Sequence, residues 1–528
     1  MKKEHNQKTN NMKKNLPNVS GRGKSLLLAF AAAMTVAFSA QADDKVKVGN
    51  FYYYLDAESK TAELAPTDKT TAYATGRLSI PGSISYDGEA YSVTAVGDYA
   101  FSFCDGITTV SIPTTVIRIG NGAFQGCKKI NTVAFSMSKV EEIGDAAFEG
   151  CETLGSITLP ATLKKLGAWA FAGCTGLRTA NIPAGVQSIG KNAYMRCTAM
   201  SAAAFRCKLS EIPDGMFGHC TSLARVTMPD SVKNNIKRIG VGAFYDCPKL
   251  TAFAFGDSIA KIDACGFMSC TSLGKVSLPE SVGHIGHDAF SACQKMTEIN
   301  IPANVDSIGD HAFKDAHALK QIAMSDSVKY LGEQAFAYCK SLTSAKLSKQ
   351  ITEIPFKAFA GCTSLTDFTL AKGVTSIADS AFQGTKCFDS LRIYNATTIG
   401  DYAFADCGNI TYVYMPEKVA KLGSYVFKGD SISQFFVEWN SAPTIKSGFF
   451  TFCDTLFIPQ GTYYKFRTGW KEAKNIKEYD KTATGINTPV INRRDDEDGA
   501  YYTVDGIKVV EPKKGGIYIH NGKKVIIR

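Results

Sequence analysis

Hydrophobic positions recur in a short fixed pattern along most of the chain. The segment L-x-x-[IV]-x-[IL]-P, seen for example at residues 273–279, alternates apolar and polar positions. Because successive side chains of a strand point to opposite faces, this pattern predicts a short strand with one buried face. The proline that follows predicts the end of the strand, since it has no N–H to donate. A second apolar pair, such as Ile117 and Ile119 before Gly120, predicts an opposite wall.

An aromatic residue marks each copy of a second motif, I-G-x-x-A-F-x-x-C. Its steps are 23 residues in eleven cases, with single steps of 24, 27 and 22. The fifteen aromatic positions are Phe101, Phe124, Phe148, Phe171, Tyr194, Phe217, Phe244, Phe267, Phe290, Phe313, Phe336, Phe359, Phe382, Phe404 and Phe427. This regularity predicts one solenoid coil per repeat, because only stacked neighbours can bury such an interior.

The 23-residue period, the I-G-x-x-A-F motif, the cysteine three residues later and the strand-ending proline resemble the leucine-rich repeat superfamily. The resemblance is to its BspA-like branch of bacterial surface proteins, over about residues 93–437. It implies a curved, right-handed leucine-rich-repeat solenoid of about fifteen coils, mainly β and turn, with a cap at each end. Tyr194 departs from the motif at the aromatic position, and Ala316, Thr385 and Asp430 depart from it at the cysteine.

The flanking segments predict caps and a tail. Residues 43–92 fit an N-terminal β cap, with strands near Tyr52 and Leu78 and a tight turn at Gly88. Residues 438–478 fit a C-terminal cap with a last strand at 456–461 and a short helix after Tyr463. A polar linker, 479–500, precedes a tail, 501–528, that resembles a type IX secretion sorting signal. A plain end cap and an export-neutral tail remain alternatives for these last residues.

The first 42 residues predict a secretory signal peptide. A basic start is followed by an apolar run at residues 26–38 and then by Ser-Ala-Gln-Ala. Thirteen apolar residues are too few to span a bilayer, and no longer apolar run follows. We therefore expect an exported protein without a transmembrane segment in the mature chain, held at the outer cell surface.

The charge distribution argues against nucleic acid as a partner. The chain has a net charge of +10, but residues 1–42 contribute +6 and residues 505–528 contribute +4. Residues 43–504 carry 46 charges of each sign, so the body of the protein is neutral. A body without net charge exerts no general electrostatic attraction on a polyanion such as nucleic acid.

The cysteines predict buried thiols rather than disulfides. Twelve of the sixteen occupy the same position of the coil, between the aromatic residue and the next leucine. Side chains repeated by translation suit disulfide geometry poorly, so we expect free thiols that pack as small hydrophobic groups. Cys207, Cys265, Cys387 and Cys453 lie outside this position, and the sequence does not settle their redox state.

Catalytic and metal-binding motifs are missing from the sequence. No nucleophile elbow, glycine-rich phosphate loop or paired carboxylates interrupt the repeats, so we expect no enzyme, no catalytic residue and no cofactor. Stacking predicts that His287 lies near His311, but the sequence offers them no carboxylate at ligand spacing. We therefore expect surface histidines and no metal site.

Outward positions of the repeated strand are the expected binding residues, because a solenoid presents an extended concave surface. The first coils carry Ser, Thr and Ala there, whereas later coils carry residue types enriched in binding hot spots. The candidates are Arg392, Tyr412, Tyr414, Phe435, Arg225, Lys275 and Lys346. The alternative is that the aromatic candidates only pack under the C-terminal cap. The resemblance implies an adhesin for host extracellular-matrix proteins or other cells, and a carbohydrate- or envelope-binding structural protein is the second hypothesis.

Overall fold

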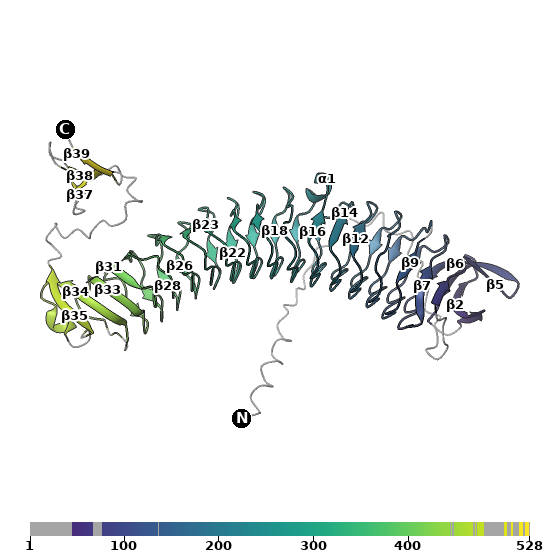
Figure 1. The fold of residues 1–528 in the computed structure, drawn as a ribbon, viewed down its shortest axis with the longest axis horizontal. Coiled ribbons are helices and arrows are strands. Elements are labelled where there is room, and N and C mark those ends of the chain that lie inside the picture. The colour runs from purple at the N-terminus through teal and green to yellow at the C-terminus, as the bar shows by residue number, and fades with distance from the viewer. Residues whose placement is uncertain are drawn as a thin grey trace, which may run out of the picture. The chain divides into compact units, whose positions relative to one another are not determined.

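The chain forms a β-solenoid in which successive coils stack side by side (Figure 1). The structure is a computed structural model that describes residues 45–66, 76–135, 137–443, 445, 448–467, 470 and 472–479, and the backbone of four strands between residues 501 and 526. The expected signal peptide, 1–42, and the expected linker beyond Tyr479 lie outside the described residues. No helix in the described part of the chain is long and apolar enough to cross a membrane.

Two walls of parallel strands build the coils. The first wall contains the L-x-x-[IV]-x-[IL] segments. Its strands are β4 (Gly76–Ser79), β7 (Ile107–Ser111), β9 (Thr132–Ala134), β12 (Thr179–Ile182), β14 (Ala202–Phe205), β16 (Arg225–Thr227), β19 (Lys275–Val276), β21 (Glu298–Ile299), β23 (Gln321–Ala323), β25 (Ser344–Lys346), β27 (Asp367–Phe368), β29 (Ser390–Arg392), β31 (Asn409–Met415), β33 (Phe427–Val437), β34 (Phe450–Pro459) and β35 (Ala473–Tyr479).

The second wall contains the strands that end just before the repeated glycine position, which is occupied by Gly in most coils. They are β6 (Glu89–Val96), β8 (Arg118–Ile119), β10 (Glu142–Ile143), β11 (Lys165–Leu166), β13 (Ser188–Ile189), β15 (Glu211–Ile212), β17 (Arg238–Ile239), β18 (Lys261–Ile262), β20 (His284–Ile285), β22 (Ser307–Ile308), β24 (Tyr330–Leu331), β26 (Glu353–Ile354), β28 (Ser376–Ile377), β30 (Thr398–Ile399) and β32 (Lys421–Leu422). Ile119 is fully buried in this wall, but Ile117 is 44% exposed. The predicted pair at this wall is therefore wrong at Ile117, and Val116 fills the interior instead.

The aromatic residues form a continuous column between the walls. All fifteen predicted residues are buried, and each ring stacks on the ring of the next coil. The centroid distances along the column range from 5.1 to 5.9 Å, and the rings are nearly parallel. Offset stacking at this separation is favourable beyond the area that the rings bury. The column confirms the predicted interior.

All sixteen cysteines are free thiols, which confirms the expectation for the twelve repeated positions. At eleven of the twelve repeated positions the Sγ–H donates to the carbonyl of the aromatic residue in the preceding coil, as from Cys127 to Phe101 at 2.9 Å. Burial raises the pKa of the Cys127 thiol to about 12. The sequence did not determine the redox state of the four other cysteines. In the structure Cys207, Cys387 and Cys453 are buried, and Cys265 is half-buried.

We expect the native protein to expose very few reactive thiols. Only the thiolate is nucleophilic, and burial disfavours its formation. A thiol reagent at pH 8 should modify Cys104 and Cys265, the two half-buried cysteines, and leave the others intact. In guanidinium chloride without reductant all sixteen should react. Rapid modification of many native thiols, or fewer than sixteen after unfolding, would contradict this assignment.

The turn after the second wall has a repeated backbone conformation. In successive coils, the residue two positions after the repeated glycine has a positive φ, as at Asn192, Asp288 and His311. In many coils the first residue is Asp or Asn, and its side-chain oxygen accepts the backbone N–H of the next coil. Asp98 accepts from Asn121 at 2.8 Å in this way, and Asn121 accepts from Asp145 at 2.8 Å. These contacts fix the position of each turn relative to its neighbour.

Both ends of the solenoid carry additional strands. At the N-terminal end, β1 (Val46–Val48), β2 (Phe51–Asp56), β3 (Thr61–Leu64) and β5 (Ser83–Tyr86) extend the second wall. The predicted turn joins β5 to β6, and Gly88 has a φ of +80°. The four-residue insertion in the longest step contains α1 (Asp230–Lys233).

At the C-terminal end, the predicted strand is part of β34 and the predicted short helix is α2 (Tyr463–Phe466). The strand is not the last one, since β35 pairs with it in parallel. The tail forms its own small antiparallel sheet of β36 (Tyr501–Thr503), β37 (Lys508–Val509), β38 (Ile517–His520) and β39 (Lys523–Ile526).

Candidate binding surface

Three of the predicted binding residues are exposed on separate coils of the first wall. Arg225 lies on β16, Lys275 on β19 and Lys346 on β25. Lys275 forms an ion pair with Glu298 of the next coil at 3.0 Å, so its charge is already balanced. These three residues lie on separate coils and do not form a cluster with one another.

Arg392 and Tyr414 come together on adjacent strands. They are paired in the register of β29 and β31, and both are half-buried on the outer side of the wall. The Arg392 guanidinium lies over the Tyr414 ring, 5.3 Å from its centroid. Such a contact is worth about 0.5–1 kcal/mol at an exposed site and more where water is excluded. The contact holds the arginine against the sheet.

This pair is the start of a longer row that sequence reasoning missed. The register continues from Tyr414 to Phe436 of β33, to Phe457 of β34 and to Lys477 of β35. The Phe436 and Phe457 rings stack at 4.1 Å. We call Arg392, Tyr414, Phe436, Phe457 and Lys477 the aromatic row. A cation stands at each end of it, and three aromatic rings lie between them.

The remaining two predicted residues are not accessible. Tyr412 lies on the outer side of β31 but is only 1% exposed, since it packs at 5.1 Å from the Phe436 ring. Phe435 points into the interior, is fully buried and stacks on Trp470 at 6.0 Å. The outward assignment of Phe435 is therefore wrong, and this residue does pack under the C-terminal cap.

A missing residue explains the error at Phe435. The aromatic residues Phe404 and Phe427 are 23 apart, but Asn409 pairs with Ser431, which is only 22 residues later. One residue is lost between the aromatic position and the strand. A slip of one residue exchanges the two faces of a strand. The apolar pair Ile410 and Ile432, also 22 apart, was the signal in the sequence that could have revealed the slip.

Burial and nearby charge perturb the tyrosines of this surface. Burial raises the pKa of Tyr414 well above its usual range, and the adjacent Glu438 carboxylate raises it further. Burial likewise raises the pKa of Tyr479 to about 12. The Tyr479 hydroxyl donates to the Val437 carbonyl at 2.9 Å. Both phenols are therefore neutral hydrogen-bonding groups at physiological pH.

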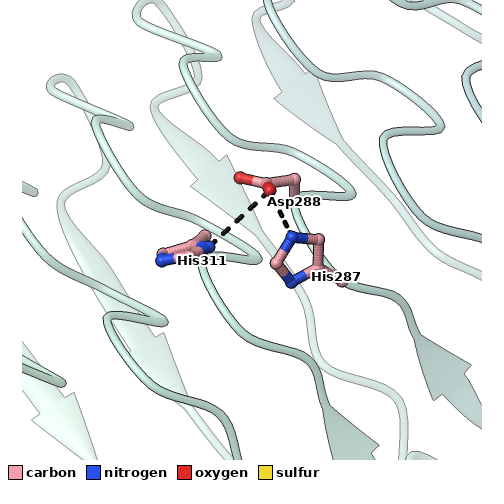
Figure 2. A group of neighbouring side chains, drawn as sticks. All are labelled: His287, Asp288 and His311. Carbon is pink, nitrogen blue, oxygen red and sulfur yellow. Dashed lines mark ion pairs between the residues drawn. The ribbon is translucent and has the colours of Figure 1, made fainter. Parts of the chain in front are cut away.

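One group of side chains among the described residues has the composition of a metal site. It consists of His287, Asp288 and His311, whose ligand atoms all lie within 4.8 Å of one another. Figure 2 shows both imidazoles beside the Asp288 carboxylate. The expectation that no carboxylate accompanies these histidines is wrong, because Asp288 lies directly between them.

Comparison with known proteins matches the repeats. A family model described as "BspA type Leucine rich repeat region (6 copies)" matches residues 135–237, 231–343 and 330–457. A leucine-rich repeat protein from Bacteroides ovatus has a similar structure, with a TM-score of 0.60 and 24% identity over 82% of this chain and 100% of that one. This similarity shows a shared fold.

Two further solved structures are similar at lower scores. A leucine rich cell surface protein from Faecalibacterium prausnitzii matches with a TM-score of 0.41 and 24% identity, over 71% of this chain and 95% of that one. The pneumococcal vaccine antigen PcpA matches with a TM-score of 0.44 and 16% identity, over 83% and 99% respectively. No curated protein matches in sequence.

Proposed function

Because this chain belongs to the BspA-type leucine-rich repeat family, we propose that it is an exported, cell-surface protein-binding solenoid. Its partners are host extracellular-matrix proteins or other cells, which makes it an adhesin. Solenoids of this kind act through extended surfaces rather than through a single pocket. The function therefore depends on which side chains the first wall presents.

The aromatic row is the observation that carries this proposal. Tyr and Arg are enriched in the hot spots of protein interfaces, and Lys and Ser are depleted. Arg392 and Tyr414 stack on each other and are half-buried, so little side-chain entropy is lost when a partner covers them. The face formed by the earlier coils offers no comparable cluster at the predicted positions.

A carbohydrate or envelope component is the second candidate ligand. Tyr414 and Phe457 are half-buried aromatic side chains in the same row, and flat aromatic faces suit sugar rings. Competition separates the two ligand classes. Binding that free glycans abolish supports this second function, whereas binding that is indifferent to glycans supports the adhesin.

Removing the Arg392–Tyr414 pair should abolish most of the binding. The full chain should bind saturably to immobilised fibronectin or fibrinogen in surface plasmon resonance. Arg392→Ala and Tyr414→Ala should each weaken that binding at least about tenfold, or about 1.4 kcal/mol, because each removes a hot-spot side chain. Tyr412→Ala is not suitable, since Tyr412 is 1% exposed and its loss would leave a cavity.

Lys346→Ala is the matched control, because it removes an exposed, isolated side chain from the same wall. It should change the affinity by less than about twofold. If the Lys346 and Tyr414 variants weaken binding equally, the site does not lie on the aromatic row. If the wild-type chain binds neither glycoprotein, the matrix-adhesin proposal fails.

A further inference from the structure

His287, Asp288 and His311 lie together at the turns of two successive coils. Nε2 of His287 is 2.7 Å from Oδ2 of Asp288, and Nδ1 of His311 is 3.6 Å from the same oxygen. The imidazole centroids are 5.1 Å apart. Figure 2 shows the two rings on either side of the carboxylate. At metal–ligand bonds of about 2.0–2.2 Å, adjacent ligands of a tetrahedral ion are about 3.4 Å apart. The 3.6 Å contact is close to this spacing, and all the ligand atoms lie within 4.8 Å of one another, so small side-chain rotations bring them to it.

The repeat creates this arrangement by reversing two residue types. One coil reads Ile-Gly-His-Asp, with His287 and Asp288, and the next reads Ile-Gly-Asp-His, with Asp310 and His311. Stacking places His287 over Asp310 and Asp288 over His311. The Asp288 N–H donates to the Asp310 carbonyl at 2.9 Å, which fixes the register of the two turns. Each histidine therefore has a carboxylate beside it and another in the adjacent coil.

The backbone holds these side chains in place before any ion binds. Asp288 and His311 both have a left-handed backbone, with φ values of 53° and 57°. The same conformation recurs at this position along the solenoid, so the direction of each Cα–Cβ bond is set by the stack and not by the ligand. The side chain of Asp288 is 15% exposed and that of His311 is 26% exposed, whereas His287 is 49% exposed and faces water.

We propose that His287, Asp288 and His311 bind a divalent transition-metal ion of the zinc class. Two imidazole nitrogens and one carboxylate oxygen are ligands that Zn²⁺, Co²⁺ and Ni²⁺ accept, whereas Ca²⁺ and Mg²⁺ prefer oxygen alone. Three protein ligands leave at least one position for water or for a group of a partner. The ion bridges two coils and links their turns.

A second layer of polar groups orients the two histidines. His311 Nε2 is 3.0 Å from the side-chain amide of Gln334, one coil further on. The atom that faces His311 is the amide nitrogen of Gln334, which donates to the unprotonated Nε2. When Nδ1 binds the ion, Nε2 carries the proton, and a flip of the Gln334 amide brings its oxygen round to accept from it. His287 Nδ1 lies 3.9 Å from Oδ2 of Asp310, which faces it from the next coil. Such outer partners fix the tautomer of a ligating histidine and raise its basicity.

Zinc titration of the full chain tests the proposal. Tag-free protein is treated with chelator, exchanged into buffer at pH 7.5 and titrated with ZnCl₂ in a calorimeter. We expect one ion per chain with a micromolar or tighter Kd. His287→Ala, His311→Ala and Asp288→Asn should each weaken that binding at least about tenfold. Co²⁺ bound at the same site should give a ligand-field spectrum that the double variant His287→Ala/His311→Ala lacks.

His219→Ala is the matched control. His219 lies 2.9 Å from Asp246 of the next coil, so it is a histidine–carboxylate pair between coils. Among the described residues, His219 does not belong to any group of three or more side chains that could hold a metal ion. This variant should keep wild-type zinc affinity. Circular dichroism spectra equal to wild type show that each variant folds. The proposal is overturned if the wild-type chain takes up no zinc, or if the double variant binds it with unchanged affinity.

Discussion

Phe290→Ala is expected to lower the free energy of unfolding by about 3–5 kcal/mol. Phe290 is fully buried in the aromatic column, and its ring stacks on Phe267 at 5.4 Å and on Phe313 at 5.8 Å. The change removes a ring that two neighbouring coils contact, and the hydrogen-bonded walls limit how far the cavity can collapse. Urea unfolding followed by circular dichroism and by fluorescence gives the stability, with coincident curves as the check on a two-state transition.

Phe103→Ala provides the comparison within the same chain, because Phe103 is 62% exposed. The loss of this exposed ring should cost no more than about 0.5 kcal/mol. An effect below about 1 kcal/mol for Phe290→Ala would show that the column does not carry the stability of the coils. Equal effects of the two changes would lead to the same conclusion.

The second large effect is expected at Asp430, a carboxyl group in a position where most coils have cysteine. Asp430 is 1% exposed. The Gly408 N–H donates to its Oδ1 at 2.8 Å, while its Oδ2 has no hydrogen-bond partner. Burial raises the pKa of this carboxyl from 3.8 to about 7. Folding therefore favours the protonated form of Asp430 over the carboxylate.

The stability should accordingly fall as the pH rises. Below about pH 4 the group is protonated in both states, and it contributes no penalty. Between about pH 4 and pH 7 the unfolded state loses the proton first, so the native state binds more protons and loses stability as the pH increases. A difference of this size corresponds to roughly 4 kcal/mol by pH 8.

Asp430→Asn removes the titration while keeping the shape of the side chain. Urea unfolding at pH 4, 6 and 8 should show a variant that is close to wild type at pH 4 and more stable by roughly 4 kcal/mol at pH 8. Asp430→Cys restores the residue that most coils have at this position. In those coils the thiol donates to the backbone carbonyl of the aromatic residue in the previous coil, as from Cys407 to Phe382. This variant should show the same loss of pH dependence. A constant difference from wild type across this pH range would rule out a buried, titrating carboxyl.

Most of the fold could be predicted because the solenoid is encoded locally. The alternation in each strand, the proline after it and the glycine before each turn act within a few residues. The 23-residue period then places every coil on the previous one. The column from Phe101 to Phe427 and the free thiols at the twelve repeated positions follow from that period. Ile117 was assigned to the wrong side because a turn precedes the two-residue strand β8, and alternation does not extend through a turn.

The candidate surface was predicted only in part, since it depends on contacts between coils. Arg392 and Tyr414 were both placed outward, but their stacking depends on the register of β29 with β31. The row also includes Phe436, Phe457 and Lys477, because β33, β34 and β35 continue the parallel sheet beyond the repeats. At Phe435 a single lost residue reversed the faces of the strand.

The sequence by itself determined the architecture: the coil, its period, its apolar interior and the neutral charge of its body. The tertiary structure decided which polar and aromatic side chains meet, because those neighbours are 22 or 23 residues apart and their register is set by hydrogen bonds between coils. The two imidazoles on either side of Asp288 illustrate the difference. Each coil taken alone shows a histidine beside an aspartate, and stacking the two coils brings the second imidazole to the same carboxylate.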